Sequence, residues 1–182
     1  MSGDRYKIAD QNKLYFVTFT IIGWVDIFTR KEYKFIIVDS LNYCIENKGL
    51  EVFAWVIMSN HIHLILRAKN NFILSHIIRD FKKHTSKEIS SSIINIPESR
   101  REWILNKFSF EAIRTGRAKN YKIWSDDNHA ICLDTNEWIE QRLEYIHQNP
   151  VKQMIVFKPE DYIFSSAIDY SGGKGLVKIL KI

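Results

Sequence analysis

The sequence is poor in the residues that build disulfide-rich, fibrous and disordered proteins. Among 182 residues there are only two cysteines, seven glycines and three prolines. The cysteines, Cys44 and Cys132, form no CxxC pair, so the sequence gives no sign of a structural zinc site. Scarce glycine and proline exclude a collagen-like chain and argue against a disordered one. We therefore expect a globular protein, and this length suits a single domain with a substantial core.

Long hydrophobic runs are missing as well. No stretch approaches the roughly 20 apolar residues that a membrane-spanning helix needs. The first residues, MSGDRYKIADQ, also lack the apolar segment of a secretory signal peptide. The sequence therefore predicts a protein without a membrane partner, and the cytoplasm is its expected location.

Basic residues outnumber acidic ones and give the chain a formal net charge of +5. A basic excess favours a polyanionic partner, because lysine and arginine neutralise phosphates and release counterions. The 11 Phe, 8 Tyr and 5 Trp suit stacking on bases as well as core packing. Net charge alone does not decide whether the protein binds nucleic acid, since many basic proteins do not.

The spacing of apolar residues predicts alternating strands and helices. Runs of β-branched and aromatic residues are typical of buried strands, and an apolar period near 3.6 indicates helices. The last main helix is expected to end at Pro150, because the residue before a proline avoids the α conformation. Strands are expected at 14–24, 51–58, 61–68 and within 121–133, and helices at 32–48, 72–90 and from about 134 to 149.

This order of elements is the split βαβ pattern of a ferredoxin-like fold. It predicts an α+β, RRM-like antiparallel sheet with helices on one face, leaving the other face free for a ligand. We expect residues 1–182 to form one domain. Residues 91–122 are interpreted as an insertion that contains a helix at 103–117, and residues 151–182 as a C-terminal tail.

Two histidines stand out on the strand expected at 61–68. His61 and His63 are two residues apart, so their imidazoles lie on the same open face and can share one metal ion. Arg67 lies on that face too, where it can meet a phosphate. An H-x-H pattern by itself is weak, because strand histidines are commonly just hydrogen-bonded polar groups.

A tyrosine on the last helix is the second candidate. Tyr145 and Asn149 are four residues apart and so lie one above the other, at the edge of the apolar face. Most tyrosines pack their ring and hydrogen-bond their hydroxyl, and helical geometry does not separate that role from chemistry. Since Asn149 precedes Pro150, we expect its stacking on Tyr145 to be only approximate.

Basic residues form two further groups. One lines the polar side of the helix at 72–90, and the other points outward from 103–117. A solvated helix face explains such a stripe about as well as DNA contact does. The candidate DNA-binding residues are therefore Arg67, Arg79, Lys83, Lys87, Arg114 and Arg117.

Several segments together resemble one family. VIMSNHIHLIL, FKKHTSKEI, IWSDDNHAICL, EYIHQNPVKQMIV and KPEDYIFSSAIDY resemble segments of the single-tyrosine HUH transposases. The resemblance is greatest to the group called REP-associated tyrosine transposases, and it covers roughly residues 10 to 170. HIH and YIHQNPV at this separation make the resemblance fairly specific.

The resemblance implies an activity and roles for four residues. Tyr145 matches the nucleophile, while His61, His63 and Asn149 match ligands of a divalent metal, Mg²⁺ or Mn²⁺. Family members cleave and rejoin single-stranded DNA beside a hairpin through a 5′-phosphotyrosine. Two histidines suit Mn²⁺ better by affinity, although availability favours Mg²⁺.

Two other functions stay open at this point. One is a domesticated relative that binds structured DNA or RNA without cutting it. The other is a metal-dependent phosphoesterase that uses water in place of Tyr145. The sequence is also compatible with a homodimer, and it does not tell whether the tyrosine acts in its own chain or in a partner.

Overall fold

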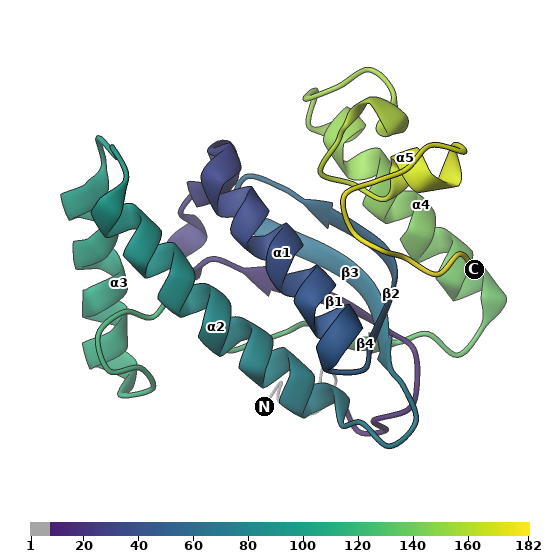
Figure 1. The fold of residues 1–182 in the computed structure, drawn as a ribbon, viewed down its shortest axis with the longest axis horizontal. Helices are drawn as coiled ribbons and strands as arrows, with labels where there is room; N and C mark the ends of the chain where they lie inside the picture. The colour runs from purple at the N-terminus through teal and green to yellow at the C-terminus, as the bar shows by residue number, and fades with distance from the viewer. Residues whose placement is uncertain (1–7) are drawn as a thin grey trace.

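The computed structural model describes residues 8–182, which form an α+β fold around a four-stranded antiparallel sheet (Figure 1). The strand order is β2-β3-β1-β4, as in a ferredoxin-like sheet, so the expected fold class is confirmed. The bounds are β1 Tyr15–Thr20, β2 Leu50–Ile57, β3 His61–Ala68 and β4 Ile131–Cys132.

Helices α1 (Lys31–Asn47) and α2 (Leu74–Asn95) lie side by side across one face of the sheet (Figure 1). Their buried residues, among them Leu41 and Phe81, form the core with the alternate residues of the strands. Two short 3-10 helices, η1 Ile22–Trp24 and η2 Ile27–Thr29, connect β1 to α1.

Helix α4 (Asn136–Lys152) lies against the opposite face, where it contacts β2 and β3. This face is therefore partly covered and is not left free as the sequence pattern predicts. The Thr135 side chain caps its first turn by accepting a hydrogen bond from the Trp138 backbone. The expectation that Pro150 ends this helix is wrong, because the helix continues to Lys152. A proline in the last turn removes only one backbone donor, and the residues after it still close the turn.

The C-terminal tail is more ordered than its sequence suggests. It contains η3 (Pro159–Asp161) and α5 (Ala167–Tyr170), and it runs beside β2 (Figure 1). The Ile57 amide donates to the Phe164 carbonyl, and the Ser166 amide donates to the Trp55 carbonyl. The tail therefore covers the outer edge of β2.

The insertion expected at 91–122 begins with the end of α2, which extends to Asn95 instead of stopping near residue 90. Helix α3 (Arg101–Thr115) follows and buries Ile104 and Phe108. Residues 122–128 then run along β1, where the Thr18 amide donates to the Asn128 carbonyl and the Ser125 amide donates to the Thr20 carbonyl.

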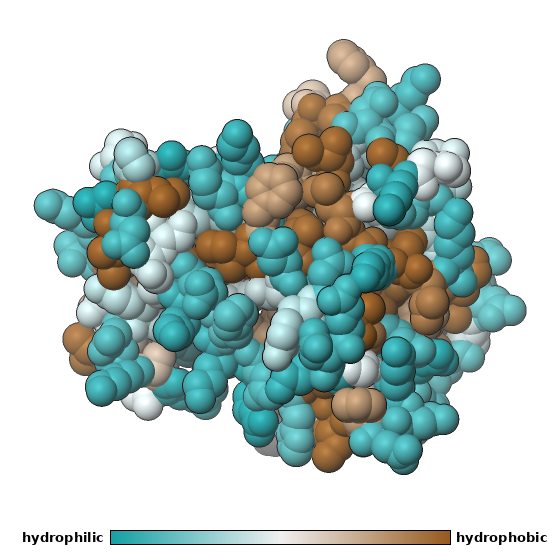
Figure 2. Space-filling model, viewed as in Figure 1, coloured by the Kyte–Doolittle hydropathy of each residue, from teal (hydrophilic) through white to brown (hydrophobic). Residues whose placement is uncertain are grey.

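Apolar side chains are distributed unevenly over the surface of the molecule. In Figure 2 hydrophobic surface gathers over the C-terminal third of the chain, whereas the helices beside it are mostly hydrophilic. Exposed apolar side chains after α4 contribute to this part: Met154, Ile155, Phe157 and Ile163. No helix within residues 8–182 is long and apolar enough to cross a membrane.

Candidate active site

The central strand β3 carries both histidines on the face that α4 covers. The rings of His61 and His63 lie edge to face, with 4.7 Å between their centroids. Strand alternation places them on one side, as the sequence predicts, and Thr18 and Thr20 of β1 lie opposite them in the register. Two ring nitrogens from this pair can approach a single ion.

His63 is buried, with only 4% of its surface exposed. Its Nδ1 is hydrogen-bonded to Thr18 Oγ1 at 2.8 Å, and its ring stacks on Phe16. Burial lowers the pKa of His63 to about 3, and nearby His61 and Arg142 act in the same direction. The imidazole is therefore neutral over the physiological range, which is the form that ligates metals.

The other ring nitrogen of His63 has no hydrogen-bond partner within residues 8–182. This atom, Nε2, is buried and unpaired. A buried polar atom without a partner costs free energy unless a ligand or ion satisfies it. Its position next to His61 makes a shared metal ion the simplest partner.

Asn60 fixes the orientation of His61. Its side-chain Nδ2 donates to the Trp24 carbonyl at 3.3 Å, which leaves Oδ1 facing the His61 ring. An amide oxygen only accepts, so His61 donates from Nδ1 over 2.7 Å and keeps its lone pair on Nε2. Burial also lowers the pKa of His61. At metal centres, a hydrogen bond from the ring nitrogen that does not bind the metal orients the histidine in this way.

Tyr145 of α4 reaches the histidines within the same chain. Its ring lies edge-on to His63 with 5.2 Å between centroids, and it also contacts Phe16. Two cations flank the ring, since the guanidinium of Arg142 lies 6.0 Å and the ammonium of Lys152 lies 5.9 Å from its centre. The structure thus brings together the tyrosine and both histidines that the sequence singles out.

Sequence reasoning missed Arg142 and Lys152, although helical spacing could have found them. They lie three residues before and seven residues after Tyr145, on the same side of the helix. Neither has an ion-pair partner in the described part of the chain, so both charges are available to an anion. Thr18 and Asn60 were also missed, because only the sheet register and the β2–β3 turn place them beside the histidines.

Asn149 follows Tyr145 by one turn of α4. Asn149 keeps helical geometry, because α4 continues through Pro150. The residue is 7% exposed, and its side-chain amide has no hydrogen-bond partner among residues 8–182. An amide oxygen and two neutral imidazoles are a donor set that fits Mn²⁺ or Mg²⁺.

No group of three or more His, Cys, Asp or Glu side chains in the described chain could hold a metal ion. The donors that the sequence proposes are instead the two histidines and the side-chain amide of Asn149, one turn of α4 after Tyr145. Such a set carries no negative charge, so a divalent ion bound there would keep its full charge toward phosphate oxygens.

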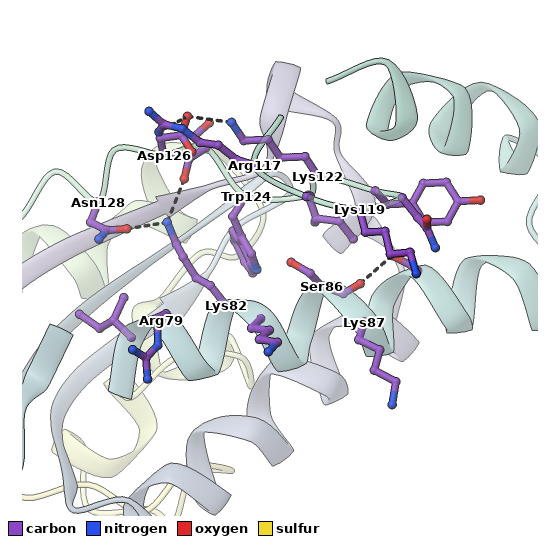
Figure 3. A pocket seen from close by; sticks show the side chains of 18 of the residues that line it. Arg79, Lys82, Ser86, Lys87, Arg117, Lys119, Lys122, Trp124, Asp126 and Asn128 are labelled. Carbon is purple, nitrogen blue, oxygen red and sulfur yellow. Dashed lines mark hydrogen bonds and ion pairs between the residues drawn. The ribbon is translucent and has the colours of Figure 1, made fainter. Parts of the chain in front are cut away.

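A groove of about 1590 Å³ opens between α2 and residues 117–128 (Figure 3). In Figure 3 Lys82 reaches toward Asn128, while Arg117 and Lys122 converge on Asp126. Burial lowers the pKa of Lys82 to about 8. The basic lining residues are Arg79, Lys82, Lys83, Lys87, Arg117, Lys119 and Lys122, and the acidic ones are Asp126 and Asp127.

All four arginines predicted to contact DNA have partners within the chain. Arg79 pairs with the adjacent Asp80 at 3.0 Å, and Arg114 with Glu111 at 2.7 Å. Arg67 donates to Glu51 of β2 and lies over the Phe53 ring.

Arg117 pairs with Asp126 at 3.0 Å. Lys83 and Lys87 are exposed on α2 and have no ion-pair partner among residues 8–182. The roles of all six residues in DNA binding stay predictions, and the two lysines have the least internal competition.

Comparisons with known proteins identify a family and a similar fold. A family model described as "Transposase IS200 like" matches residues 15–149. A solved structure of a REP-associated tyrosine transposase bound to a REP hairpin is similar in fold, with a TM-score of 0.65. It is 18% identical, and the alignment covers 100% of this chain and 93% of that one.

A candidate transposase from Deinococcus radiodurans aligns less well, with a TM-score of 0.44 and 15% identity over 77% of this chain and 93% of its own. No curated protein matches the sequence. The family model spans most of the chain and includes β3 and nearly all of α4. By this match, the chain belongs to the IS200-like transposase family.

Proposed function

We propose that this transposase cleaves and rejoins single-stranded DNA through a covalent bond to Tyr145. The observation that carries the proposal is the unpaired Nε2 of buried His63, which lies beside Tyr145 and His61 of the same chain. Buried polar atoms usually have a hydrogen-bond partner, and this one faces a second histidine and a tyrosine.

In the proposed step the Tyr145 oxygen attacks a phosphodiester phosphorus. The new P–O bond to tyrosine forms as the bond from phosphorus to the 3′ oxygen breaks. The phenol gives up its proton, and the departing oxygen gains one and leaves as a 3′-hydroxyl. Attack by that hydroxyl, or by the 3′-hydroxyl of another strand, reverses the chemistry and rejoins DNA without an external energy source.

The residues around Tyr145 suit this step. A neutral phenol is a weak nucleophile and gains from nearby positive charge as its proton leaves. Arg142 and Lys152 supply that charge and can also hold phosphate oxygens near the ring. We assign no general base.

A divalent metal would be held by His61, His63 and Asn149. When bound, Mn²⁺ or Mg²⁺ would polarise the scissile phosphate as a Lewis acid. The chain's own contribution is to keep both imidazoles neutral by burial and oriented by Thr18 and Asn60.

The DNA substrate is proposed to include a hairpin. The similar REP-associated transposase was solved with a REP hairpin, and this chain has a basic groove beside α2. Lys83 and Lys87 are the first choice for phosphate contacts there, while Arg67, Arg79, Arg114 and Arg117 would have to exchange internal partners. We propose that residues 1–182 act as one domain, and that any homodimer leaves each tyrosine in its own site.

The test uses an oligonucleotide hairpin with single-stranded extensions on both sides, labelled at its 3′ end. With Mn²⁺ the wild-type protein is expected to acquire the label in a complex that survives denaturation, since the 5′ phosphate of the downstream fragment stays on tyrosine. Tyr145→Phe should neither cut nor label. Tyr43→Phe is the matched control, because Tyr43 is exposed on α1, on the other side of the sheet.

Two results would contradict the proposal. Cutting by Tyr145→Phe without an adduct would identify a phosphoesterase that uses water. Tight hairpin binding by the wild type, with no cutting at any metal concentration, would identify a domesticated binding protein.

A further inference from the structure

An exposed tryptophan stands beside the histidine pair. Trp24, at the end of η1, has 67% of its surface exposed. Its ring lies edge-on to His61 with 6.4 Å between centroids. Indole is rarely left so open to water without a partner, and flat aromatic faces are the usual platforms for unpaired bases.

The backbone holds Trp24 in a conformation that tryptophan rarely adopts. Its φ is 57°, in the left-handed region that residues with a Cβ seldom occupy. Asn60 keeps it there by donating to the Trp24 carbonyl, and the same amide accepts from His61. One residue thus ties the tryptophan to the candidate metal ligand.

Helix α3 supports the same turn. Gly23 precedes Trp24 with φ of 61°, and a Cβ at Gly23 would lie 2.2 Å from the Lys107 side chain. The lysine stem therefore packs against bare backbone, and its ammonium lies 6.0 Å from the centre of the exposed Trp103 ring. Lys107 has no ion-pair partner in the part of the chain that the structure describes.

These contacts join the insertion to the active site. Trp24, Lys107 and Trp103 form a surface, here called the tryptophan platform, that offers two indoles and one cation and begins at His61. Alternating aromatic and basic groups fit the alternating bases and phosphates of an unpaired strand. The ammonium of Lys107, which has no ion-pair partner among the described residues, fits a DNA strand better than an apolar protein surface.

We propose that Trp24 stacks on a base of the single-stranded DNA next to the scissile phosphate, and that Lys107 binds a phosphate of the same strand. This inference rests on the proposed function, since it assigns the strand that enters the histidine site. It also gives the insertion a role, because α3 positions the turn and contributes the cation.

The test measures binding in the Tyr145→Phe background, where no cutting interferes. The probe is a hairpin with a single-stranded extension, used intact and as a series in which one extension base at a time is abasic. Trp24→Ala should bind the intact probe roughly tenfold more weakly, as expected for loss of one stacked base, and Trp24→Phe should retain most of the affinity. Tyr43→Ala, which removes an exposed ring on the far side of the sheet, should bind like the parent.

The abasic series separates stacking from a general effect. One abasic position should weaken the parent as much as Trp24→Ala does, and the two losses together should not exceed either alone. Lys107→Met keeps the side-chain stem on Gly23. It should reduce the slope of log K against log salt concentration by the amount expected for about one lost phosphate contact.

The inference is overturned if Trp24→Ala binds like the parent, or if its loss adds fully to that of every abasic position. Adduct formation by the wild type is measured separately. Adduct formation together with either of those binding results would reject the tryptophan platform and leave the proposed function standing.

Discussion

The histidine site and the basic groove differ in how their polar groups are satisfied. In the groove, Lys82, Arg117 and Lys122 reach acceptors of the chain itself. At the histidine site, the buried Nε2 of His63 has no hydrogen-bond partner among the described residues. Arg142 and Lys152 lie over aromatic rings and have no ion-pair partner there. A charged surface is therefore not the best guide to chemistry here, because internal ion pairs already use much of the groove's charge.

The histidine site should be the more sensitive of the two regions. His61→Ala and His63→Ala are each expected to reduce metal-dependent cleavage by at least about 100-fold, the upper range for loss of a residue that only supports a ligand. Hairpin binding in the absence of metal should change little. Melting temperature checks folding, and His61→Ala is the more informative variant because His63 is buried. Near-normal cleavage by both variants would mean that His61 and His63 have a structural role only.

The closeness of Tyr145 to His63 in one chain predicts how mixtures of variants behave. Tyr145→Phe and His61→Ala are each expected to be inactive. Mixing them should restore no cleavage, because neither chain contains a complete site. Denaturing gels of the labelled hairpin give the readout. Recovery of about a quarter or more of wild-type activity, as random dimers sharing sites would give, would show that the tyrosine acts in a partner's site.

A smaller loss of metal affinity or cleavage is expected from replacing Thr18, which is hydrogen-bonded to His63. Thr18→Val should lower metal affinity or cleavage by about 10- to 100-fold, because His63 Nδ1 loses its hydrogen-bond partner. Thr20→Val is the matched control, since Thr20 lies two residues along the same strand face, opposite His61. Isothermal titration with Mn²⁺ compares the two. Equal losses in both variants would mean that general packing, not the Thr18 hydrogen bond, is responsible.

The smallest effect is expected in the groove. Replacing Lys83 and Lys87 together by glutamine should weaken hairpin binding and reduce the slope of log K against log salt by about two contacts. Arg79→Gln with Arg114→Gln removes the same charge from residues that pair internally, and this double variant should change the slope less. A larger change in the arginine variant would mean that DNA displaces the internal carboxylates.

The sequence predicts the site's strand better than its helix. Strand β3 runs from His61 to Ala68 as expected, because Ile62, Leu64, Leu66 and Ala68 alternate and fix the face that packs into the core. The burial of its other face under α4 was not predicted. Helix α4 continues through Pro150, because one missing donor in a last turn is tolerated. Local rules thus found the histidine face but misplaced a helix end.

Partners distant in sequence were out of reach of such rules. Thr18 meets His63 only because β1 and β3 pair in one register, and Arg117 meets Asp126 only because the insertion folds back beside β1. The sequence shows that these groups are polar or charged. Only the fold shows which are already bonded and which are free to bind a ligand.

The tail that runs beside β2 has a consequence for assembly. Edge strands with free backbone groups are the usual place where two copies of a protein merge their sheets. Here the backbone of residues 164–166 and the Leu180 amide occupy that edge of β2. The opposite border of the sheet is the two-residue β4, too short to template a partner strand. A second copy would therefore have to dock through side chains and not by extending the sheet.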